Sequence, residues 1–293
     1  MNRKGIILAG GSGTRLYPIT MAVSKQLMPL YDKPMIYYPL TVLMLAGLRE
    51  VAIITTPQDR AQFQRLLGDG SQWGMALTFI EQPAPEGLAQ AYVLAEDFLA
   101  GAPSAMVLGD NIFYGHGLQE VMLKAARHDG GGTVFGYQVR APERYGVLDF
   151  DAGGKVTRLV EKPQVPPSDF ALTGLYFLDG RAPGRAATLT PSARGELEIV
   201  DLLQVYLEEG SLDVALLGRG YGWLDTGTHD SLLEAGAFVQ TLEKRQGLKI
   251  GCPEEVAYLK GWIDADAVRE LAKPFLKTEY GQYLVRMVDH KQP

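Results

Sequence analysis

The sequence contains one cysteine, no long apolar run and no excess of positive charge. Cys252 is the single cysteine among 293 residues, so no disulfide can form within the chain, as is usual in a reducing compartment. No run of about 18 apolar residues occurs, and no charged segment is followed by the apolar stretch of a signal peptide. We therefore expect a cytoplasmic protein with no membrane partner.

The charge balance argues against a second class of partner. The 34 Asp and Glu residues outnumber the 28 Lys and Arg residues, which gives a net charge of −6. A nucleic-acid-binding surface needs clustered, excess positive charge, so we expect no nucleic-acid partner. Anionic substrates remain possible, because a local site can be positive while the whole protein is not.

Motifs for zinc hydrolysis and for nucleophilic catalysis are also missing. The four histidines have no i, i+4 pair, no G-x-S-x-G motif occurs, and Cys252 has no evident base. The mechanism that these absences leave open is catalysis by alignment of the reactants and neutralisation of charge, as in phosphoryl-type transfers.

The most informative stretch is residues 4–34, KGIILAGGSGTRLYPITMAVSKQLMPLYDKP. Its apolar run at 5–9 predicts a buried strand, which ends in the cluster GGSG at 10–13. Glycines at the carboxyl end of a strand let backbone N–H groups approach a phosphate closely. Arg15 and Lys25 add two cations, so the pattern predicts a polyphosphate-binding loop. The alternative is that the glycine-rich turn only makes room for tight packing and binds no phosphate.

Two common glycine loops do not fit this stretch. The Walker loop requires Gly-Lys-Ser/Thr, whereas Gly13 is followed by Thr14 and Arg15. The dinucleotide-binding fingerprint requires a third glycine where this chain has Leu16, and no ribose-binding acid stands out about 20 residues further on.

Apolar runs that alternate with helical patterns predict an α/β fold. Strands are predicted at 5–9, 51–55, 77–80, 105–108, 133–139, 172–178 and 213–217, and helices at 35–47, 59–67, 88–98, 118–128, 196–207, 228–247 and 264–272. Strand–helix–strand units imply parallel strands, so we expect a doubly wound, mostly parallel, Rossmann-like sheet. Residues 145–161 predict a hairpin-like insertion, and a turn is predicted at 220–222. We expect residues 1–240 to form the core and residues 241–293 a helical extension packed on it.

Polar residues follow several predicted strands, at the edge where such sheets bind ligands. Asp110 follows the strand at 105–108, and Asp225 lies in the segment WLDTG. Each could simply cap a turn, but a triphosphate normally arrives with Mg²⁺, which takes one or two carboxylates. The amide of Gln82 offers the donor and the acceptor that the edge of a pyrimidine base requires. The alternative is that Gln82 is only a solvent-facing residue in a turn.

Glu161 and Lys162 end another predicted strand. Because adjacent side chains on a strand point to opposite faces, we expect them to do more than form a mutual salt bridge.

The combination of GGSGTRL at 10–16, SKQ at 24–26 and DKP at 32–34 resembles the sugar-1-phosphate nucleotidyltransferases. The string SKQLMPLYDKPMIYYPL at 24–40, with LGDN, RGELE and WLDTGTH, is similar to the thymidylyl-transferring branch, and the resemblance covers essentially the whole chain. It implies that dTTP and α-D-glucose 1-phosphate give dTDP-glucose and pyrophosphate, with Mg²⁺ as cofactor, at the entry to dTDP-rhamnose and deoxysugar synthesis. UTP or another sugar phosphate remains open, as does a catalytically silent sugar-nucleotide-binding regulator.

The resemblance also assigns roles to residues. The catalytic residues would be Arg15, Lys25, Asp110, Lys162 and Asp225, with the metal held by Asp110 and Asp225. The nucleotide site would comprise Leu8, Gly10, Gly11, Gly13, Thr14, Arg15, Gln26, Gln82, Gly87 and Asp110. The sugar-phosphate site, with its insertion around residues 140–220, would comprise Asn111, Gly146, Glu161, Lys162, Leu172, Tyr176 and Arg194. A solvated position is the alternative for Arg194.

Members of the family are usually homotetramers and are often inhibited by a downstream product such as dTDP-rhamnose at a second site. Residues matching that site are Tyr114, Gly115, Arg219, Cys252 and Glu255. Gln119 and Leu259 differ from the more polar or basic residues expected there, which predicts altered feedback inhibition.

Overall fold

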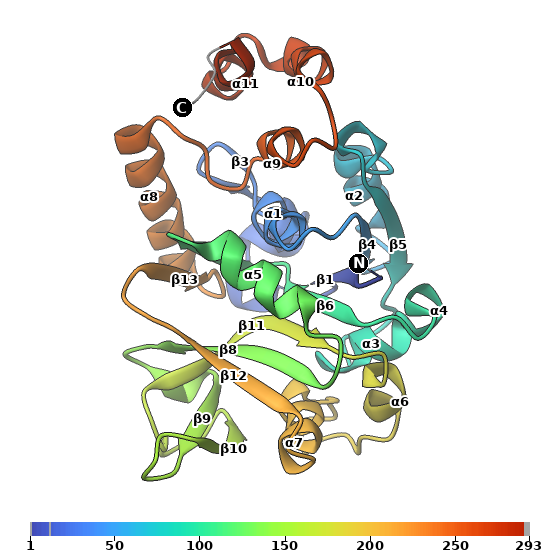
Figure 1. The fold of residues 1–293 in the computed structure, drawn as a ribbon, viewed down its shortest axis with the longest axis vertical. Coiled ribbons are helices and arrows are strands. Elements are labelled where there is room, and N and C mark those ends of the chain that lie inside the picture. Colours follow the sequence, from blue (N-terminus) through green and yellow to red (C-terminus); the bar gives the residue numbers. More distant parts are fainter. Residues whose placement is uncertain (1, 12, 290–293) are drawn as a thin grey trace.

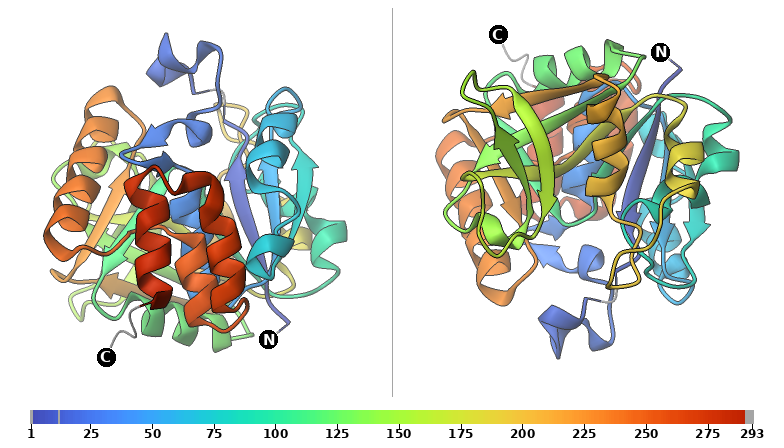
Figure 2. Two further views of the ribbon diagram at one scale, coloured as in Figure 1. Left: turned by 90° about the horizontal axis from the view of Figure 1, so that it is seen from above. Right: turned by 90° about the horizontal axis from the view of Figure 1, so that it is seen from below.

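The computed structural model describes residues 2–11 and 13–289. Four strands form the parallel half of its main sheet: β1 (Lys4–Ala9), β4 (Glu50–Thr55), β6 (Ser104–Leu108) and, at the edge, β5 (Ala76–Glu81). They lie in the order β5–β4–β1–β6, and all three pairings are parallel. Their carboxyl ends therefore meet at one edge of the sheet, whose strands are labelled in Figure 1. The loop after β1 projects from this edge (Figure 2).

The other half of the sheet is largely antiparallel. Its strands are β8 (Gly132–Gln138), β9 (Gly146–Phe150), β10 (Val156–Glu161), β11 (Phe170–Leu178) and β12 (Leu212–Leu217). β11 runs antiparallel to β6 and β8, while β12 is parallel to β8. The β9–β10 hairpin joins the sheet where Val147 pairs with Ala171. Within the described residues the sheet has nine strands.

Helices cover both faces of this sheet, because β1, β4 and β6 are apolar on both sides. Ile7, Ile53 and Val107 face one core, which contains α1 (Tyr37–Leu45), α2 (Arg60–Leu67) and α5 (Leu118–Arg127). Ile6, Ile54 and Met106 face the other, which contains α3 (Gln90–Leu94), α4 (Glu96–Leu99), α6 (Ala182–Ala187) and α7 (Ile199–Glu208). The predicted doubly wound α/β fold is confirmed.

The C-terminal part is helical, as predicted. Its helices are α8 (His229–Gln246), α9 (Pro253–Leu259), α10 (Ala265–Ala272) and α11 (Glu279–Asp289). Thr228 caps α8 through Ser231, and the last three helices lie together above α1 (Figure 2). The expected boundary at residue 240 falls within α8, and residues 290–293 lie outside the described part of the chain.

The DKP segment at 32–34 forms ion pairs with the end of α8 and the residues that follow it. Lys33 is buried and its Nζ contacts Glu243 Oε1 at 2.8 Å. Lys249 also pairs with Glu243, at 2.7 Å, and with Asp32. Two lysines and two acids therefore join the segment to the end of α8.

Besides the two-residue strands β2 (Pro29–Leu30) and β3 (Lys33–Pro34), two longer strands lie outside the sequence prediction. β7 (Asn111–Gly115) pairs antiparallel with β13 (Tyr221–Asp225), where only a turn at 220–222 is expected. Glycines disfavour strands, but here the partner strand overrides local preference. The helix predicted at 88–98 is divided between α3 and α4, and the one predicted at 196–207 begins at Ile199.

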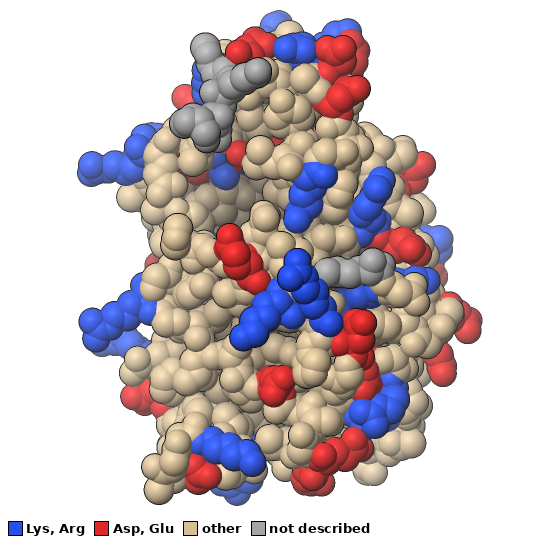
Figure 3. Space-filling model, in the orientation of Figure 1, with Lys and Arg blue, Asp and Glu red and all other residues tan. Residues whose placement is uncertain are grey.

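Short elements complete the connections. They are η1 (Thr14–Leu16), η2 (Ile19–Met21), η3 (Lys25–Leu27), β2 (Pro29–Leu30), β3 (Lys33–Pro34), η4 (Ser71–Trp73), η5 (Pro142–Arg144) and η6 (Lys273–Phe275). In the described residues no helix combines the length and apolar character needed to cross a bilayer. Acidic and basic side chains are interspersed over the face seen in Figure 3.

Candidate active site

The glycine loop follows β1 at the carboxyl edge and passes very close to Gln82. A Cβ atom built on Gly10 would lie 1.9 Å from Gln82 Oε1, so only glycine permits this approach. Gly11 is exposed, and Thr20 Oγ1 donates a hydrogen bond to the Gly13 carbonyl at 2.7 Å. Thr14 is exposed on η1, while Leu8 is buried beneath the loop. Ser12 lies outside the described residues.

The two cations of the predicted loop lie beside the two candidate metal ligands. Lys25, on η3, is buried and forms an ion pair with Asp110. A Cβ atom built on Gly227 would lie 3.1 Å from Asp225 Oδ2 and 3.5 Å from Arg15 Nη1. Arg15 and Asp225 therefore face the same small space.

Strand pairing brings Asp110 and Asp225 together from distant parts of the sequence. The β7–β13 register sets Asp225 opposite Asn111, next to Asp110. The backbone N–H and hydroxyl of Thr226 donate to the Asp110 carbonyl, at 3.3 and 3.0 Å. The structure thus gathers both carboxylates at the end of the glycine loop.

The charges of these carboxylates are unequally compensated. Burial opposes ionisation of Asp110, but attraction and a hydrogen bond from Lys25 outweigh it and hold the pKa of Asp110 below its ordinary value. Burial, and then repulsion from Asp110, raise the pKa of Asp225. In the described part of the chain no third His, Cys, Asp or Glu completes a metal-binding group with them.

Asn111 is fixed by three hydrogen bonds. Its Nδ2 donates to Asp110 Oδ1 at 2.9 Å, and its Oδ1 accepts from the Gly174 N–H at 3.1 Å and from Trp223 Nε1 at 2.7 Å. Trp223 is not among the predicted site residues, although it belongs to the WLDTG segment. Trp223 therefore couples β13 to the centre of the sheet through Asn111.

The predicted sugar-phosphate residues gather around the β9–β10 hairpin. Gly146 is the cross-strand partner of Glu161. A Cβ atom built on Gly146 would lie 3.5 Å from Glu161 Oε2 and 3.6 Å from Leu172 Cβ. Tyr176 is buried on β11, where burial, and then Glu161 and Asp110, raise its pKa.

Lys162 departs from the geometry expected for the end of a strand. Its Nζ contacts Glu161 Oε1 at 2.9 Å, so the two side chains lie together and not on opposite faces of the strand. The cause is the backbone of Lys162, whose φ of 40° turns its side chain back beside that of Glu161. Arg194 joins the same carboxylate at 3.2 Å and also contacts Glu198 at 2.8 Å.

Two of the predicted base-binding residues, Gln82 and Gly87, follow β5, whereas Gln26 lies on η3 beside Lys25. Gly87 has a φ of 106°, and a Cβ atom there would fall 2.3 Å from the Leu197 carbonyl oxygen. Gln26 is buried, and its Oε1 accepts from Ser24 Oγ at 2.9 Å. Gln82 donates to Gln90 at 2.6 Å. Gln90 is missed by sequence reasoning, because its position on α3 resembles that of any buried helix residue.

Tyr145 is a further residue that the sequence does not single out as part of the site. Its ring lies 5.1 Å from that of Trp223, and its carbonyl accepts from the Lys162 N–H at 3.0 Å. Burial, and then Asp225, raise its pKa. Tyr145 thus lies between the carboxylate pair and the sugar-phosphate residues.

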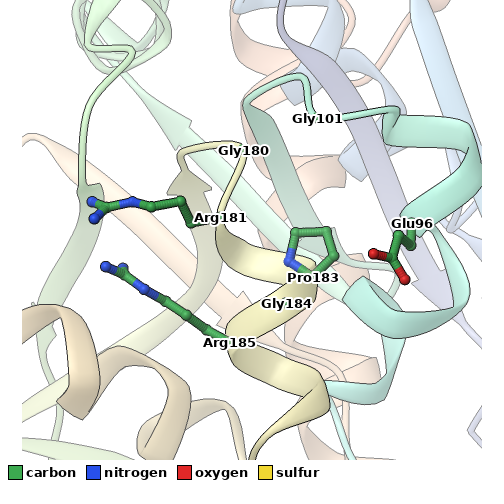
Figure 4. A pocket seen from close by; sticks show the side chains of 7 residues that line it. All are labelled: Glu96, Gly101, Gly180, Arg181, Pro183, Gly184 and Arg185. Carbon is green, nitrogen blue, oxygen red and sulfur yellow. The ribbon is translucent and has the colours of Figure 1, made fainter.

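A hollow of about 450 Å³ occurs at the opposite edge of the sheet, where β6 begins and β11 ends. The side chains of Arg181 and Arg185 extend to the same side there (Figure 4). Arg181 pairs with Asp179 at 2.7 Å, and Arg185 pairs with Glu209. None of the predicted site residues lines this hollow.

Comparison with known proteins shows the family to which the chain belongs. A model of the nucleotidyl transferase family matches residues 4–241. The glucose-1-phosphate thymidylyltransferase of Xanthomonas campestris pv. campestris is 60% identical over 285 residues, covering 97% of each chain. That of Neisseria meningitidis is 57% identical over 285 residues, covering 97% of this chain and 99% of its own. A candidate glucose-1-phosphate thymidylyltransferase of Bacillus anthracis, crystallised with sucrose, is 38% identical with a TM-score of 0.75, covering 80% of this chain and 94% of that chain. The chain belongs to the nucleotidyl transferase family.

Proposed function

We propose that this protein transfers the thymidylyl group of dTTP to α-D-glucose 1-phosphate, producing dTDP-glucose and pyrophosphate. One observation carries the proposal. The glycine loop, Arg15 and Lys25 meet the Asp110–Asp225 pair at one edge of the sheet. A candidate base reader, Gln82, lies on one side of them, and the Glu161–Lys162 pair lies on the other. Relatives that are 57–60% identical over almost the whole chain carry the matching name.

The residues suit a direct displacement at the α-phosphorus. A phosphate oxygen of the sugar phosphate forms the new P–O bond, and the bond to the bridging oxygen breaks, so that its electron pair leaves with pyrophosphate. Arg15 and Lys25 would hold the leaving pyrophosphate, and Lys162 would hold the attacking phosphate. Lys25 would exchange Asp110 for phosphate when the nucleotide binds, since the two compete for one ammonium group.

Asp110 and Asp225 fit Mg²⁺. They offer two carboxylates, and Mg²⁺ prefers oxygen ligands from one or two carboxylates together with phosphate and water. The raised pKa of Asp225 reflects burial and then its neighbour Asp110, a pairing that a divalent cation would relieve. When bound, the ion would neutralise triphosphate charge and help to align the reacting groups.

Of two alternatives, one has a physical basis and the other is disfavoured by the residues present. UTP is a plausible second substrate, because one methyl group in an apolar pocket changes binding by only about 1–3 kcal/mol. A silent regulator that binds a sugar nucleotide could lack Arg15, Lys25, Asp110 or Asp225. All four are present and adjacent, which favours the enzyme.

We also propose a homotetramer in the cytoplasm, serving dTDP-rhamnose or another deoxysugar pathway. An exposed apolar surface supports self-association: Met21 and Leu233 are 70% and 75% exposed, and Ile19 and Leu233 line a hollow of about 420 Å³. Altered feedback inhibition is supported by Leu259, an exposed apolar side chain near the predicted second site. Sedimentation measures the assembly, and normal inhibition by dTDP-rhamnose would contradict altered feedback.

The decisive experiment is pyrophosphate release with glucose 1-phosphate and Mg²⁺, with dTTP, UTP, CTP, GTP and ATP offered separately. We expect strong turnover with dTTP, followed by UTP. If the folded protein turns over none of them, the proposed reaction is wrong, and a different sugar phosphate or a binding-only role becomes the better explanation. Omission of Mg²⁺ from the same assay tests the cofactor.

A further inference from the structure

Gln82 is the first of three polar side chains that are hydrogen-bonded in series beyond β5. Gln82 Nε2 donates to Gln90 Oε1 at 2.6 Å, and Gln90 Nε2 donates to Glu86 Oε2 at 2.8 Å. The backbone N–H of Glu86 also donates to Gln90 Oε1, at 3.2 Å. Gln82 and Gln90 are only 3% and 8% exposed, so water competes little for the bond between them, whereas Glu86 is itself exposed.

The carboxylate of Glu86 determines the direction of the whole series. A carboxylate can only accept hydrogen bonds, so it requires the NH₂ group of Gln90 on its side. The Gln90 oxygen must then face Gln82 and requires the NH₂ group of that residue. The Gln82 oxygen is left on the opposite side, immediately over Gly10.

This oxygen is an acceptor beside the glycine loop, on a residue that is only 3% exposed as a whole. Among the described residues no side chain or backbone group donates a hydrogen bond to it, although Gln82 is almost fully buried. An acceptor that has so little access to water is stabilised by a donor, and a bound ligand can supply one. The geometry therefore favours a ligand that presents an N–H group at this position.

We infer that Glu86 and Gln90 are positioning residues that make the nucleotide site select pyrimidines carrying a proton at N3. The inference rests on the proposed function, in which Gln82 reads the base. Thymine and uracil have an N3–H that the Gln82 oxygen can accept, whereas N3 of cytosine is itself an acceptor. The series thus rejects dCTP and does not distinguish dTTP from dUTP.

Gln90→Met tests the series with little change in volume. In this variant Gln82 Nε2 loses its acceptor, the amide can turn over, and either end can face the base. We expect the ratio of kcat/KM for dTTP to that for dCTP to fall by about tenfold or more, because a mismatched polar group no longer opposes cytosine. A purely structural defect would lower both values together.

A double variant exchanges the two ends of the series and keeps its direction. In Glu86→Gln combined with Gln90→Glu, the new carboxylate at position 90 can only accept, so it again requires the NH₂ group of Gln82. We expect the dTTP to dCTP ratio to return close to that of the parent protein. Failure of this rescue would contradict directional control.

The matched control lies on α7. Gln204 Nε2 donates to Glu208 Oε1 at 3.0 Å, which is the same amide–carboxylate pair at the same spacing as Gln90 and Glu86. Glu208→Gln should leave the ratio unchanged.

Calorimetric binding of dTDP and dCDP to each variant gives the same ratio without turnover. If the parent protein turns over dTTP and Gln90→Met leaves both ratios unchanged, the inference is overturned while the proposed function stands. If the parent protein neither turns over dTTP nor binds dTDP, the proposed function fails and the inference fails with it.

Discussion

The ion pair between Lys25 and Asp110 should contribute to stability as well as to turnover. The Lys25 side chain is 8% exposed and that of Asp110 is 19% exposed, so Lys25→Met would leave a nearly buried carboxylate without its cation. Removal of one partner from a buried pair costs about 3–5 kcal/mol. Asp110 keeps some solvent contact and its hydrogen bond from Asn111, so we expect a loss of about 2–3 kcal/mol in the free energy of unfolding.

That loss corresponds to a fall in Tm of about 4–12 °C for a chain of this size. Urea unfolding followed by circular dichroism would measure the free energy, and pyrophosphate release would measure turnover. We expect turnover in Lys25→Met to fall by at least about a hundredfold, because a cation aimed at the phosphates is lost.

A double-mutant cycle separates the two effects. Adding Asp110→Asn to Lys25→Met removes the unpaired charge, so the double variant should be more stable than the sum of the single losses predicts, by about 1–3 kcal/mol. It should remain inactive. Lys273→Met is the matched control, because Lys273 pairs with Glu270 in solvent, with side chains 64% and 68% exposed. Strictly additive losses at Lys25 and Asp110 would refute the stabilising role of the pair.

Three further substitutions have defined outcomes. Burial raises the pKa of Glu255, so ionisation of this carboxyl opposes folding as the pH rises. Glu255→Gln should therefore be more stable than the parent protein at pH 7, by about 1 kcal/mol in the free energy of unfolding. Urea titrations should show that this advantage disappears below about pH 4.5, where the carboxyl is protonated in both states. Gly87→Ala should lose about 1–3 kcal/mol by urea unfolding, because φ is 106° and the Leu197 carbonyl stands in the way, whereas Gly184→Ala, which meets no atom within 4 Å, should not. Trp223→Phe removes the donor to Asn111 and should cost about 1 kcal/mol while raising KM for glucose 1-phosphate; an unchanged KM would contradict the placement of Asn111 in the sugar site.

The strands β1, β4 and β6 could be predicted because each is a short apolar run that is buried on both faces. Ile6 and Ile7 point into opposite cores, as do Ile53 and Ile54, so the sequence shows continuous hydrophobicity rather than alternation. The parallel pairing then explains why residues that follow β1, β5 and β6 meet at one edge. The long helix α8 could also be predicted, since Thr228 caps its start and Gly247 ends it.

Other parts of the site depend on contacts that no local pattern reveals. The β7–β13 pairing joins residues 111 and 225, and neither strand has a clear apolar alternation. The Glu161–Lys162 contact depends on a positive φ at a lysine, which sequence does not indicate. The series from Gln82 to Glu86 requires Gly87 to bring its loop against Leu197, so it becomes visible only with the backbone in place.

The acids and bases of the site neutralise one another, and this has a consequence for substrate binding. Lys25 pairs with Asp110, while Lys162 and Arg194 both pair with Glu161. Under the proposed function each substrate phosphate would draw a cation away from its carboxylate, which would then need a replacement. A divalent cation can replace Lys25 beside Asp110, and sugar hydroxyls can donate to Glu161 in place of Lys162. Both replacements arrive with the substrates, so a phosphate without its metal or its sugar should bind weakly. The pairing of charges within the protein therefore favours binding of the complete substrates.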